Sequence, residues 1–558
     1  MKLRQSVVVL LIVLPSLVFL TLATDQDPVF KATTRLVEIS VVASDDKGNP
    51  VTDLKKEDFT ILEDGKSQQL SHFFTEAMLR GAPPPPVLPK GVFTNRPEFL
   101  PSTPKSVNAI VIDYLNTPWA AQTATREQLL AVLKTLGEND VVAIYTLGQT
   151  LTILHDFTSD RKALEEKLKN FEGTLALRGK SQTDLIRLSS DRWSRVFLER
   201  RAEAENVYQA TMQRTRTLLT IRTLSLLARH MAGIPGRKNL IWMSAGFPIS
   251  VTPTNTTTPT VLMSESTGIR MQNMPRAEVA LSGDSASLFL DTLDKAIEVM
   301  NDAGVAVYGL DVMGLVVPMA SAETGFNSAV TNSALVRFSR DQVSQSSLVE
   351  LSGRTGGVAT LNSNDIAAPM KRALDDARYA YTLAYYTTNP KNDGKFRKLE
   401  IKLKRPGVKL RYRNGYTADD QGQTQAPALK ADLDEAAKSP VIQTAVLLTA
   451  QLQSKSKDEF ILAIQIEPTQ LSFQQKKDTW EASLDLMFFQ KTPDGKMNGV
   501  HAALPLKLNQ DAYQTVLKKG LLYRRTIARD AGAYALRVVV RDAINGATGT
   551  LDIPLERP

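Results

Sequence analysis

The chain has 558 residues, of which 43% are hydrophobic and 23% are charged, and its formal net charge is +8. This length predicts about three to four domains. The composition is typical of folded, globular proteins and excludes a disordered chain. Because the positive charge is spread along the sequence, we expect no nucleic acid among the partners.

The residue types exclude several kinds of site. There is no cysteine, so disulfides, thiolate nucleophiles and zinc–thiolate centres are absent. The histidines lie far apart in the sequence, and none accompanies a GxSxG motif. They are His72, His155, His230 and His501. We therefore expect a protein that is not an enzyme and that has no certain cofactor.

The first residues, 1–24, have the layout of a secretory signal peptide. Lys2 and Arg4 precede the apolar run Val7–Leu22, and small residues follow at a plausible cleavage site. An uncleaved membrane anchor is the alternative, because the run is only slightly shorter than the roughly 20 residues that span a bilayer. In both cases we expect the protein to be exported and to act in the periplasm or outside the cell.

A β-rich segment and a stiff segment come next. Residues 34–80 alternate apolar and polar positions and contain turns rich in Asp, Gly and Asn, which predicts an N-terminal β-module. Residues 81–105 begin with GAPPPPVLPKG, whose prolines favour an extended polyproline linker. We expect this linker to separate the β-module from the rest of the chain.

Residues 106–388 alternate predicted strands and helices. Apolar runs such as VNAIVID, NLIWMS and VAVYGLDV predict buried strands, and the segments between them carry helical stripes. The alternation predicts an α/β domain with a mostly parallel sheet and helices on both faces, because parallel strands need crossover connections. Two insertions are expected in it, a helical one at 175–232 and a loop at 251–283.

The remainder of the chain is expected to be mainly β-structure. Residues 389–416 predict a β-hairpin extension with apolar positions inward and lysines outward. The polar stretch 417–439 is interpreted as a linker. Residues 440–558 contain several short strands separated by turn signals, which predicts a C-terminal β-sandwich-like domain.

Three polar residues end predicted strands of the α/β domain: Asp113, Ser244 and Asp311. In open parallel sheets, ligands bind at the carboxyl ends of the strands. We therefore expect the three side chains to share one edge of the sheet, which we call the rim, and to form a binding surface there. A turn-forming role is the alternative for Asp311.

Two further segments need an interpretation. Ser352–Gly357, SGRTGG, is glycine-rich but lacks the GK[ST] ending of a phosphate loop and follows a predicted helix, so it predicts a helix-to-strand turn. Arg192–Arg222 mixes charged faces with apolar residues, which predicts an amphipathic helix packed on the domain. A helix that docks a partner is the alternative.

Several of these segments together resemble one family. They are NAIVIDYLNT, GRKNLIWMSAGFP, GVAVYGLDVMGL, LSGRTGG, DGKFRKLEIKLKRPGVKLRYRNGY and the leader VEISVVASDDKGNPVTDLKKEDFTILEDGKSQQLSHF. This series resembles the VWFA-related family known chiefly from acidobacterial genomes, over about Arg35–Tyr416. The resemblance implies a von Willebrand factor A-like domain, with a Rossmann-type sheet, between flanking β-regions. The biochemical role of the family is largely unassigned, so the resemblance implies a fold more than a function.

The resemblance also implies a metal-ion-dependent adhesion site, in which oxygen donors hold Mg²⁺ or another divalent cation. Asp113 and Thr117 match the pattern DxSxS after the first strand, whereas Leu115 replaces its middle serine. In the alternative interpretation, Asp113 has a capping or turn role and Leu115 packs onto the domain.

The rest of the implied site is incomplete. Asn116 and Thr220 could add oxygen ligands, and Ser244 or Ala245 stands where the adhesion site has its second carboxylate. A hard dication held by one carboxylate gains less electrostatic energy than one held by two. The sequence therefore indicates a degenerate metal site.

Three functional hypotheses follow. The first is an exported, non-enzymatic protein-binding or adhesion-type protein that uses the rim to bind a protein or cell-surface ligand of unknown identity. The second is an envelope assembly factor or chaperone-like A-domain protein. The third is a hydrolase that uses the rim carboxylates. Contact with a membrane is expected only through an uncleaved signal anchor.

Overall fold

The computed structural model describes residues 36–75, 78, 87–99, 107–137, 140–171, 192–246, 283–313, 345, 347–389, 391, 393–418, 426–494 and 497–555. The expected signal peptide, almost all of the expected loop at 251–283 and the prolines at 83–86 lie outside these residues. Within the described ranges, no helix combines the length and the apolar character needed to cross a membrane.

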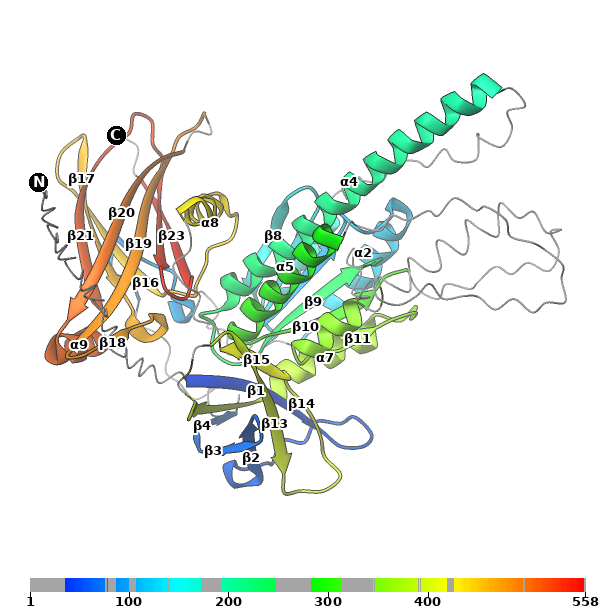
Figure 1. The fold of residues 1–558 in the computed structure, drawn as a ribbon, viewed down its shortest axis with the longest axis horizontal. Helices are drawn as coiled ribbons and strands as arrows, with labels where there is room; N and C mark the ends of the chain where they lie inside the picture. The colour runs from blue at the N-terminus through cyan, green and yellow to red at the C-terminus, as the bar shows by residue number, and fades with distance from the viewer. Residues whose placement is uncertain are drawn as a thin grey trace, which may run out of the picture.

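A six-stranded sheet lies at the centre of the α/β domain, in the order β11-β10-β9-β6-β7-β8 (Figure 1). Neighbouring strands are parallel, except that β8 runs antiparallel to β7 at one edge. The mixed α/β fold with a mostly parallel sheet, predicted from the alternation of strands and helices, is confirmed. The strands are β6 (Val107–Asp113), β7 (Val142–Leu147), β8 (Leu151–Thr158), β9 (Lys238–Ser244), β10 (Val305–Asp311) and β11 (Ala359–Thr360).

Helices cover both faces of this sheet (Figure 1). Every residue of β6 is buried, and its side chains alternate between two cores. Val111 packs in the core that contains residues of α4 and α5, and Ile112 packs in the core that contains residues of α2, α3 and α7. Burial on both faces explains why this strand is a continuous apolar run. The helices are α2 (Trp119–Leu133), α3 (Arg161–Lys169), α4 (Arg192–Met231), α5 (Gly283–Asp302) and α7 (Ala367–Tyr379).

Strands from two distant parts of the chain form the N-terminal β-domain. β1 lies between β14 and β12 in one sheet, and β2 lies between β13 and β3 in the other. The expected module at 34–80 therefore shares sheets with the expected extension at 389–416 and with the last strand of the segment 106–388. A hairpin alone buries too little apolar surface to be stable, and here Ile39 and Leu383 join one core. The strands are β1 (Leu36–Ser44), β2 (Phe59–Glu63), β3 (Lys66–Gln68), β4 (Leu70–Thr75), β12 (Tyr381–Tyr386), β13 (Lys395–Leu403), β14 (Lys409–Arg411) and β15 (Gly415–Ala418).

The C-terminal β-domain consists of two sheets that pack around one core. β5 joins the first sheet by pairing with β16, although it belongs to the segment 81–105 that was expected to be a linker. Phe93 of β5 packs against the core, which an extended linker would leave exposed. The strands are β5 (Val92–Thr94), β16 (Leu448–Ser454), β17 (Glu459–Ile466), β18 (Gln474–Lys476), β19 (Thr479–Lys491), β20 (Met497–Leu508), β21 (Leu521–Ala528), β22 (Ala535–Asp542) and β23 (Thr548–Pro554).

A helix replaces part of the linker expected at 417–439. This helix, α8 (Ala426–Lys438), packs on the C-terminal β-domain, where Leu433 and Ala437 are buried with Phe489 and Val539. Leu433 and Ala437 are four residues apart and therefore lie on one face of the helix. The surrounding polar residues hide this short apolar stripe in the sequence.

Both β-domains have contacts near the amino ends of the parallel strands. Arg237, directly before β9, donates a hydrogen bond to Ser40 of β1 at 3.2 Å. Arg413 donates to the backbone oxygen of Asn301, close before β10, at 2.6 Å. On the other side, Thr444 of the C-terminal β-domain donates to the backbone oxygen of His230 at the end of α4, at 2.7 Å. The carboxyl ends of the strands therefore point away from both β-domains (Figure 1).

The glycine-rich segment Ser352–Gly357 forms the predicted turn, which is confirmed. Helical residues 347–354 precede it, and β11 follows it. Gly356 has a φ of +79°, a conformation that favours glycine. A Cβ atom on Gly357 would lie 1.9 Å from the backbone oxygen of Val307, so the second glycine lets the turn pack directly on β10.

Candidate functional site at the rim

The structure brings two of the three expected rim residues into direct contact. Asp113 ends β6 and Ser244 ends the neighbouring strand β9, and the Ser244 hydroxyl donates to Asp113 Oδ2 at 2.8 Å. Asp311 is paired in register with Ser244 on the next strand. Its carboxylate has other partners, the backbone N–H of Met313 at 2.9 Å and the amide of Gln345 at 3.1 Å. The three residues share one edge, but only two share one hydrogen-bond network.

The carboxylate of Asp113 accepts four hydrogen bonds from the protein itself. Oδ1 accepts from the backbone N–H of Asn116 at 3.0 Å. Oδ2 accepts from the Asn116 side-chain amide at 2.8 Å, from the Ser244 hydroxyl, and from the indole N–H of Trp242 at 3.2 Å. This bonding includes the local turn that the sequence offered as the alternative role of Asp113.

Asn116 connects the carboxylate to helix α4. Its side-chain N–H group also donates to the Thr220 hydroxyl at 3.0 Å, and its Oδ1 accepts from Arg216 Nε at 3.0 Å. A guanidinium group can only donate, so this contact requires that the amide oxygen face Arg216 and that the amide nitrogen face Asp113. Arg216 therefore orients Asn116 as a donor to the carboxylate.

Thr117 and Leu115 have structural contacts. The Thr117 hydroxyl accepts a hydrogen bond from the backbone N–H of Ala245 at 3.1 Å, and its backbone oxygen accepts from Gln122 at 2.9 Å. Leu115 is buried in the main core of the α/β domain. Both residues thus close the loop after β6 against its neighbours, as in the second interpretation of this motif.

Burial separates this network from any partner. Asp113, Thr220 and Ser244 have no exposed surface. Asn116 is 1% exposed, Thr117 is 2% exposed and even Asp311 is only 6% exposed. Burial raises the pKa of Asp113, while the hydrogen bonds from Asn116, Ser244 and Trp242 act in the opposite direction. The network is therefore a support beneath the rim and not its contact surface.

These donors do not fit a divalent cation at Asp113. A cation needs oxygen lone pairs, whereas Asn116, Ser244 and Trp242 all present hydrogens to the carboxylate. Asp113 is the one carboxylate of the network, and among the described residues no group of three His, Asp or Glu side chains is placed to hold a metal ion. Asn116 would have to rotate its oxygen away from Arg216 to become a ligand.

Sequence reasoning missed two members of the network, Trp242 and Arg216. Both could have been found from periodicity. Trp242 is two residues before Ser244 on the same strand, so the two side chains share one face of the sheet. Arg216 is four residues before Thr220, so both lie on one face of α4.

No protein-family model matches the sequence, and no curated protein matches it. Similar solved structures include an aerotolerance-related membrane protein from Bacteroides fragilis, with 12% identity, a TM-score of 0.22 and coverage of 49% of this chain and 98% of that one. The PilB minor pilin from Streptococcus sanguinis has 8% identity, a TM-score of 0.23 and coverage of 50% and 62%. Proximal thread matrix protein 1 from the mussel byssus has 9% identity, a TM-score of 0.22 and coverage of 50% and 49%. Likenesses with such TM-scores carry no argument about this chain.

Proposed function

We propose that the protein is an exported, non-enzymatic protein-binding protein whose α/β domain, of von Willebrand factor A type, binds its partner through the rim side without a metal ion. The position of Asp113 after β6 and the mostly parallel sheet support the domain type. The buried, fully hydrogen-bonded Asp113 supports a role without metal or general-base chemistry, because its carboxylate is in contact with protein donors and not with solvent.

The observation that carries this proposal is the overhang of helix α4 at the rim. α4 has 40 residues and is thus about 60 Å long, whereas the adjacent strand β9 has 7 residues and is about 23 Å long. The helix and the strand are joined at the amino end of β9, so the first part of α4 extends past the rim (Figure 1). Arg216 and Thr220 hold the helix to the rim network where the overhang begins.

Exposed side chains on and near this overhang suit a protein partner. Tyr208 is 50% exposed, and Leu218, close to the Asn116 contact, is 40% exposed. Met313, two residues after Asp311, is 44% exposed. Exposed aromatic, aliphatic and methionine side chains are typical of protein interfaces. The C-terminal β-domain reaches α4 at Arg222, which pairs with Glu435 of α8 at 2.6 Å. Tyr208 lies 14 residues earlier, about 21 Å further along the helix, so this contact leaves it exposed.

Site-specific photo-crosslinking in cells that export the full chain tests the proposal. A photoreactive amino acid replaces Tyr208 at the overhang, and in a matched control it replaces Tyr534, which is 48% exposed in the C-terminal β-domain. We expect a discrete crosslinked protein from position 208, unchanged by a chelator, and none from position 534. The same products from both positions, or loss of the product in chelator, would contradict the proposal.

The identity of the crosslinked protein separates an adhesion role from an assembly role. A single subunit of an envelope complex would support an assembly role, and a surface protein or polymer would support adhesion. The experiment also tests the exported location, because a partner from the cell interior would contradict it.

A further inference from the structure

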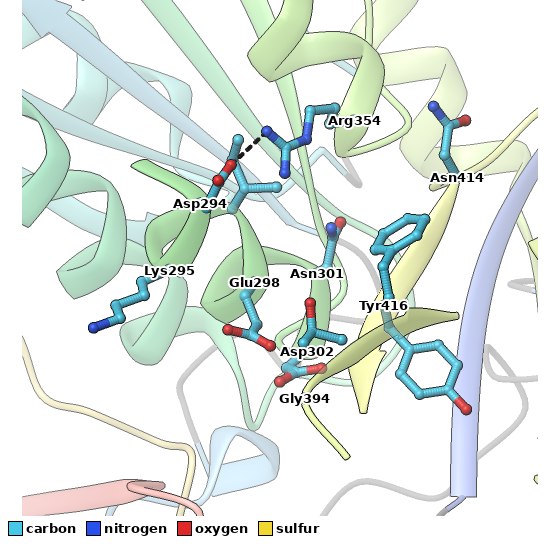
Figure 2. Close-up of a pocket in the computed structure, with 12 residues that line it drawn as sticks. Asp294, Lys295, Glu298, Asn301, Asp302, Arg354, Gly394, Asn414 and Tyr416 are labelled. Carbon is cyan, nitrogen blue, oxygen red and sulfur yellow. Dashed lines mark hydrogen bonds and ion pairs between the residues drawn. The ribbon is translucent and has the colours of Figure 1, made fainter. Parts of the chain in front are cut away.

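The cavity between helix α5 and strands β13 and β15 favours neither sign of charge. It has a volume of about 470 Å³, and its lining contains both acidic and basic side chains, among them Asp294, Lys295 and Arg354. Arg354 contacts Asp294 at 2.7 Å, so part of this charge is paired within the protein (Figure 2). A more selective surface lies along two strands of the C-terminal β-domain.

These two strands, β20 and β21, are edge strands of opposite sheets. Among the described residues, β20 pairs with β19 alone and β21 pairs with β17 alone. Helix α9 (Gln510–Lys519) connects them along the chain. Phe488, which is opposite Val500 of β20, stacks on Tyr523 of β21 with ring centroids 6.0 Å apart. Both edges therefore lie on the same side of the domain, which we call the open side.

Apolar side chains that point towards the core are only partly buried at the open side. They include Leu504 and Leu506 on β20 and Tyr523 on β21. On the inner strand β22, by contrast, Leu536 and Val538 have no exposed surface. The apolar interior between the two sheets is therefore partly accessible to a partner along β20 and β21.

The backbone of β21 has free hydrogen-bonding groups at every second residue. The N–H group of Arg529 donates to the backbone oxygen of Asp458 at 2.7 Å, which fixes the phase of the β17–β21 ladder. In an antiparallel ladder, only alternate residues bond to a given neighbour. Leu522, Arg524 and Thr526 therefore direct their N–H and C=O groups away from β17. None of the three is a proline, so all three N–H groups can bond to an added strand.

A proline blocks the corresponding edge of β20. The N–H group of Ala543 donates to the backbone oxygen of Ser483 at 2.9 Å, so Ser483 faces β22 and the next residue, Leu484, faces β20. Leu484 is opposite Leu504, which therefore bonds to β19 and leaves Pro505 facing outward. Proline has no N–H group and protects an edge strand against pairing. Of the two edges, β21 is the one that can accept a strand.

The open side is positively charged. Residues 497–529 contain six Lys or Arg residues and one acidic residue, Asp511. β20 and β21 themselves contain no acidic residue, and Arg524 is exposed in the middle of the free edge. The one acidic residue of β17, Glu459, contacts Lys455 at 2.8 Å. A strand that carries carboxylates therefore complements this edge electrostatically.

The same charges disfavour a second copy of the chain at this edge. Two β21 strands paired through their free edges would bring Arg524 and Arg525 of one copy next to the same residues of the other. Like charges on neighbouring strands destabilise pairing. The partner that fits is therefore an acidic strand of a different protein.

We propose that β21 binds an extended segment of another protein in which acidic and apolar residues alternate. The segment adds a strand beside β21 and bonds to the backbone of Leu522, Arg524 and Thr526. Its apolar side chains enter the open side towards Leu504 and Tyr523, and its carboxylates lie on the opposite face, beside Arg524. In strand addition, main-chain hydrogen bonds give affinity and alternate side chains give specificity.

This edge is separate from the rim and from the control position Tyr534. The rim belongs to the α/β domain, whereas β21 belongs to the C-terminal β-domain. The N–H group of Leu555 donates to the backbone oxygen of Tyr534 at 2.9 Å, which places Tyr534 beside β22 and the end of β23, at the side opposite β20. Partners at α4 and at β21 can therefore be tested independently.

Fluorescence anisotropy of labelled peptides with the full chain tests the proposal. The probe is a seven-residue peptide of alternating glutamate and valine, and its counterpart carries lysine in place of glutamate. We expect saturable binding of the acidic peptide and no binding of the lysine peptide. Strand addition uses only every second N–H group of the peptide. N-methylation should therefore abolish binding when it is placed on one set of residues, glutamates or valines, and preserve binding when it is placed on the other.

Variants locate the binding. Thr526→Pro removes an outward N–H group that the fold does not use, and it should weaken the affinity by about tenfold. Ala503→Pro makes the same change at the outward edge of β20 and should leave the affinity unchanged. Arg524→Gln should weaken it by about threefold, whereas Arg372→Gln, an exposed position on α7, should not. Thermal unfolding of each variant shows that it is folded.

Three results would overturn the proposal. The first is that the natural chain does not bind the acidic peptide, or binds the lysine peptide equally well. The second is an unchanged affinity in folded Thr526→Pro or, should that variant not fold, equal binding of both N-methylated peptides by the natural chain. The third is a dimer of the natural chain in sedimentation velocity that Arg524→Gln strengthens and the acidic peptide does not dissociate, which would place a second copy at this edge.

Discussion

Two buried oxygen acceptors lie at opposite ends of the same parallel strands, and their surroundings differ. Asp113, at the carboxyl end, is fully buried and accepts four hydrogen bonds from Asn116, Ser244 and Trp242. The Oδ1 atom of Asn301, at the amino end, is buried and has no donor within the part of the chain that the structure describes. The position with the formal charge is therefore the one that the protein satisfies internally, whereas the oxygen of the neutral amide is left without a donor among the described residues. From the residue types alone, the charged carboxylate would have been expected to need an external partner, and the neutral amide would not.

The largest effect is expected from Asp113→Ala. This change leaves the donors of Asn116, Ser244 and Trp242 buried without their shared acceptor, so we expect the free energy of unfolding to fall by about 3–5 kcal/mol. Denaturant unfolding of the full chain measures it. Asp113→Asn keeps one acceptor oxygen and should lose less. A stability close to that of the natural chain in both variants would show that the carboxylate is not needed for this network.

A smaller loss is expected from Arg216→Met, which keeps most of the side-chain volume but removes the donor to Asn116 Oδ1. We expect a loss of about 1 kcal/mol in the free energy of unfolding. In a double-mutant cycle with Asn116→Ala, the two losses should not add, because both residues act in one network. Full additivity would show that Arg216 and Asn116 act separately.

Asn301→Leu should change stability least among the buried replacements. It substitutes an apolar side chain of similar size for an amide whose oxygen has no donor in the described ranges, so we expect a change of less than about 1 kcal/mol in either direction. Thermal unfolding of Asn301→Leu and Asp113→Asn under the same conditions compares the stability losses at the two ends of the sheet. A loss as large as that of Asp113→Asn would mean that the Asn301 side chain is as well bonded as Asp113.

The smallest effect concerns pH and a carboxylate away from both sites. Burial alone would raise the pKa of Asp156, but the hydrogen bond and charge of His230 outweigh it and lower the pKa to about 2. Because the folded state favours the charged carboxylate, its stabilisation is present above the ordinary value of 3.8 and is lost as the pH falls towards about 2. The side chain is 55% exposed, so solvent screens most of the effect.

His230→Gln tests this dependence. Thermal unfolding between pH 5 and pH 2 should show a shallower acid loss for the variant than for the natural chain. His501 contacts Asp485 in the C-terminal β-domain, so His501→Gln is a matched control. This variant should leave the acid loss of stability that is assigned to Asp156 unchanged. Parallel acid profiles for His230→Gln and the natural chain would contradict the role of His230.

Strong periodicity and continuous apolar runs made the central sheet predictable from the sequence. VNAIVID and NLIWMS are apolar at nearly every position because helices cover both faces of β6 and β9. The shared edge of Asp113 and Ser244 followed from the same reasoning, since parallel neighbours end at one edge. Their hydrogen bond was not predicted. For these residues, the local sequence pattern predicts the same strands that the long-range contacts of the structure show.

Other features depend on partners that are distant in the chain. Nothing near Val92–Thr94 shows that this strand pairs with Leu448–Ser454, because the pairing joins residues more than 300 positions apart. The same holds for Leu36–Ser44, which pairs with Tyr381–Tyr386. The direction in which Asn116 presents its amide depends on Arg216, which the motif does not contain. The motif therefore suggested Asn116 as an oxygen ligand, whereas in the structure its amide donates a hydrogen bond to Asp113.

Titration of the full chain with Mg²⁺, Mn²⁺ and Ca²⁺ would test most directly whether Asp113 is satisfied by the protein alone. Calorimetry on the natural chain and on Asp113→Asn is the measurement, since the variant removes the one carboxylate of the network. We predict no saturable heat for any of the three ions with either protein. Saturable binding to the natural chain that disappears in Asp113→Asn would show that the network opens to hold a cation, and would contradict the internal pairing described for the rim.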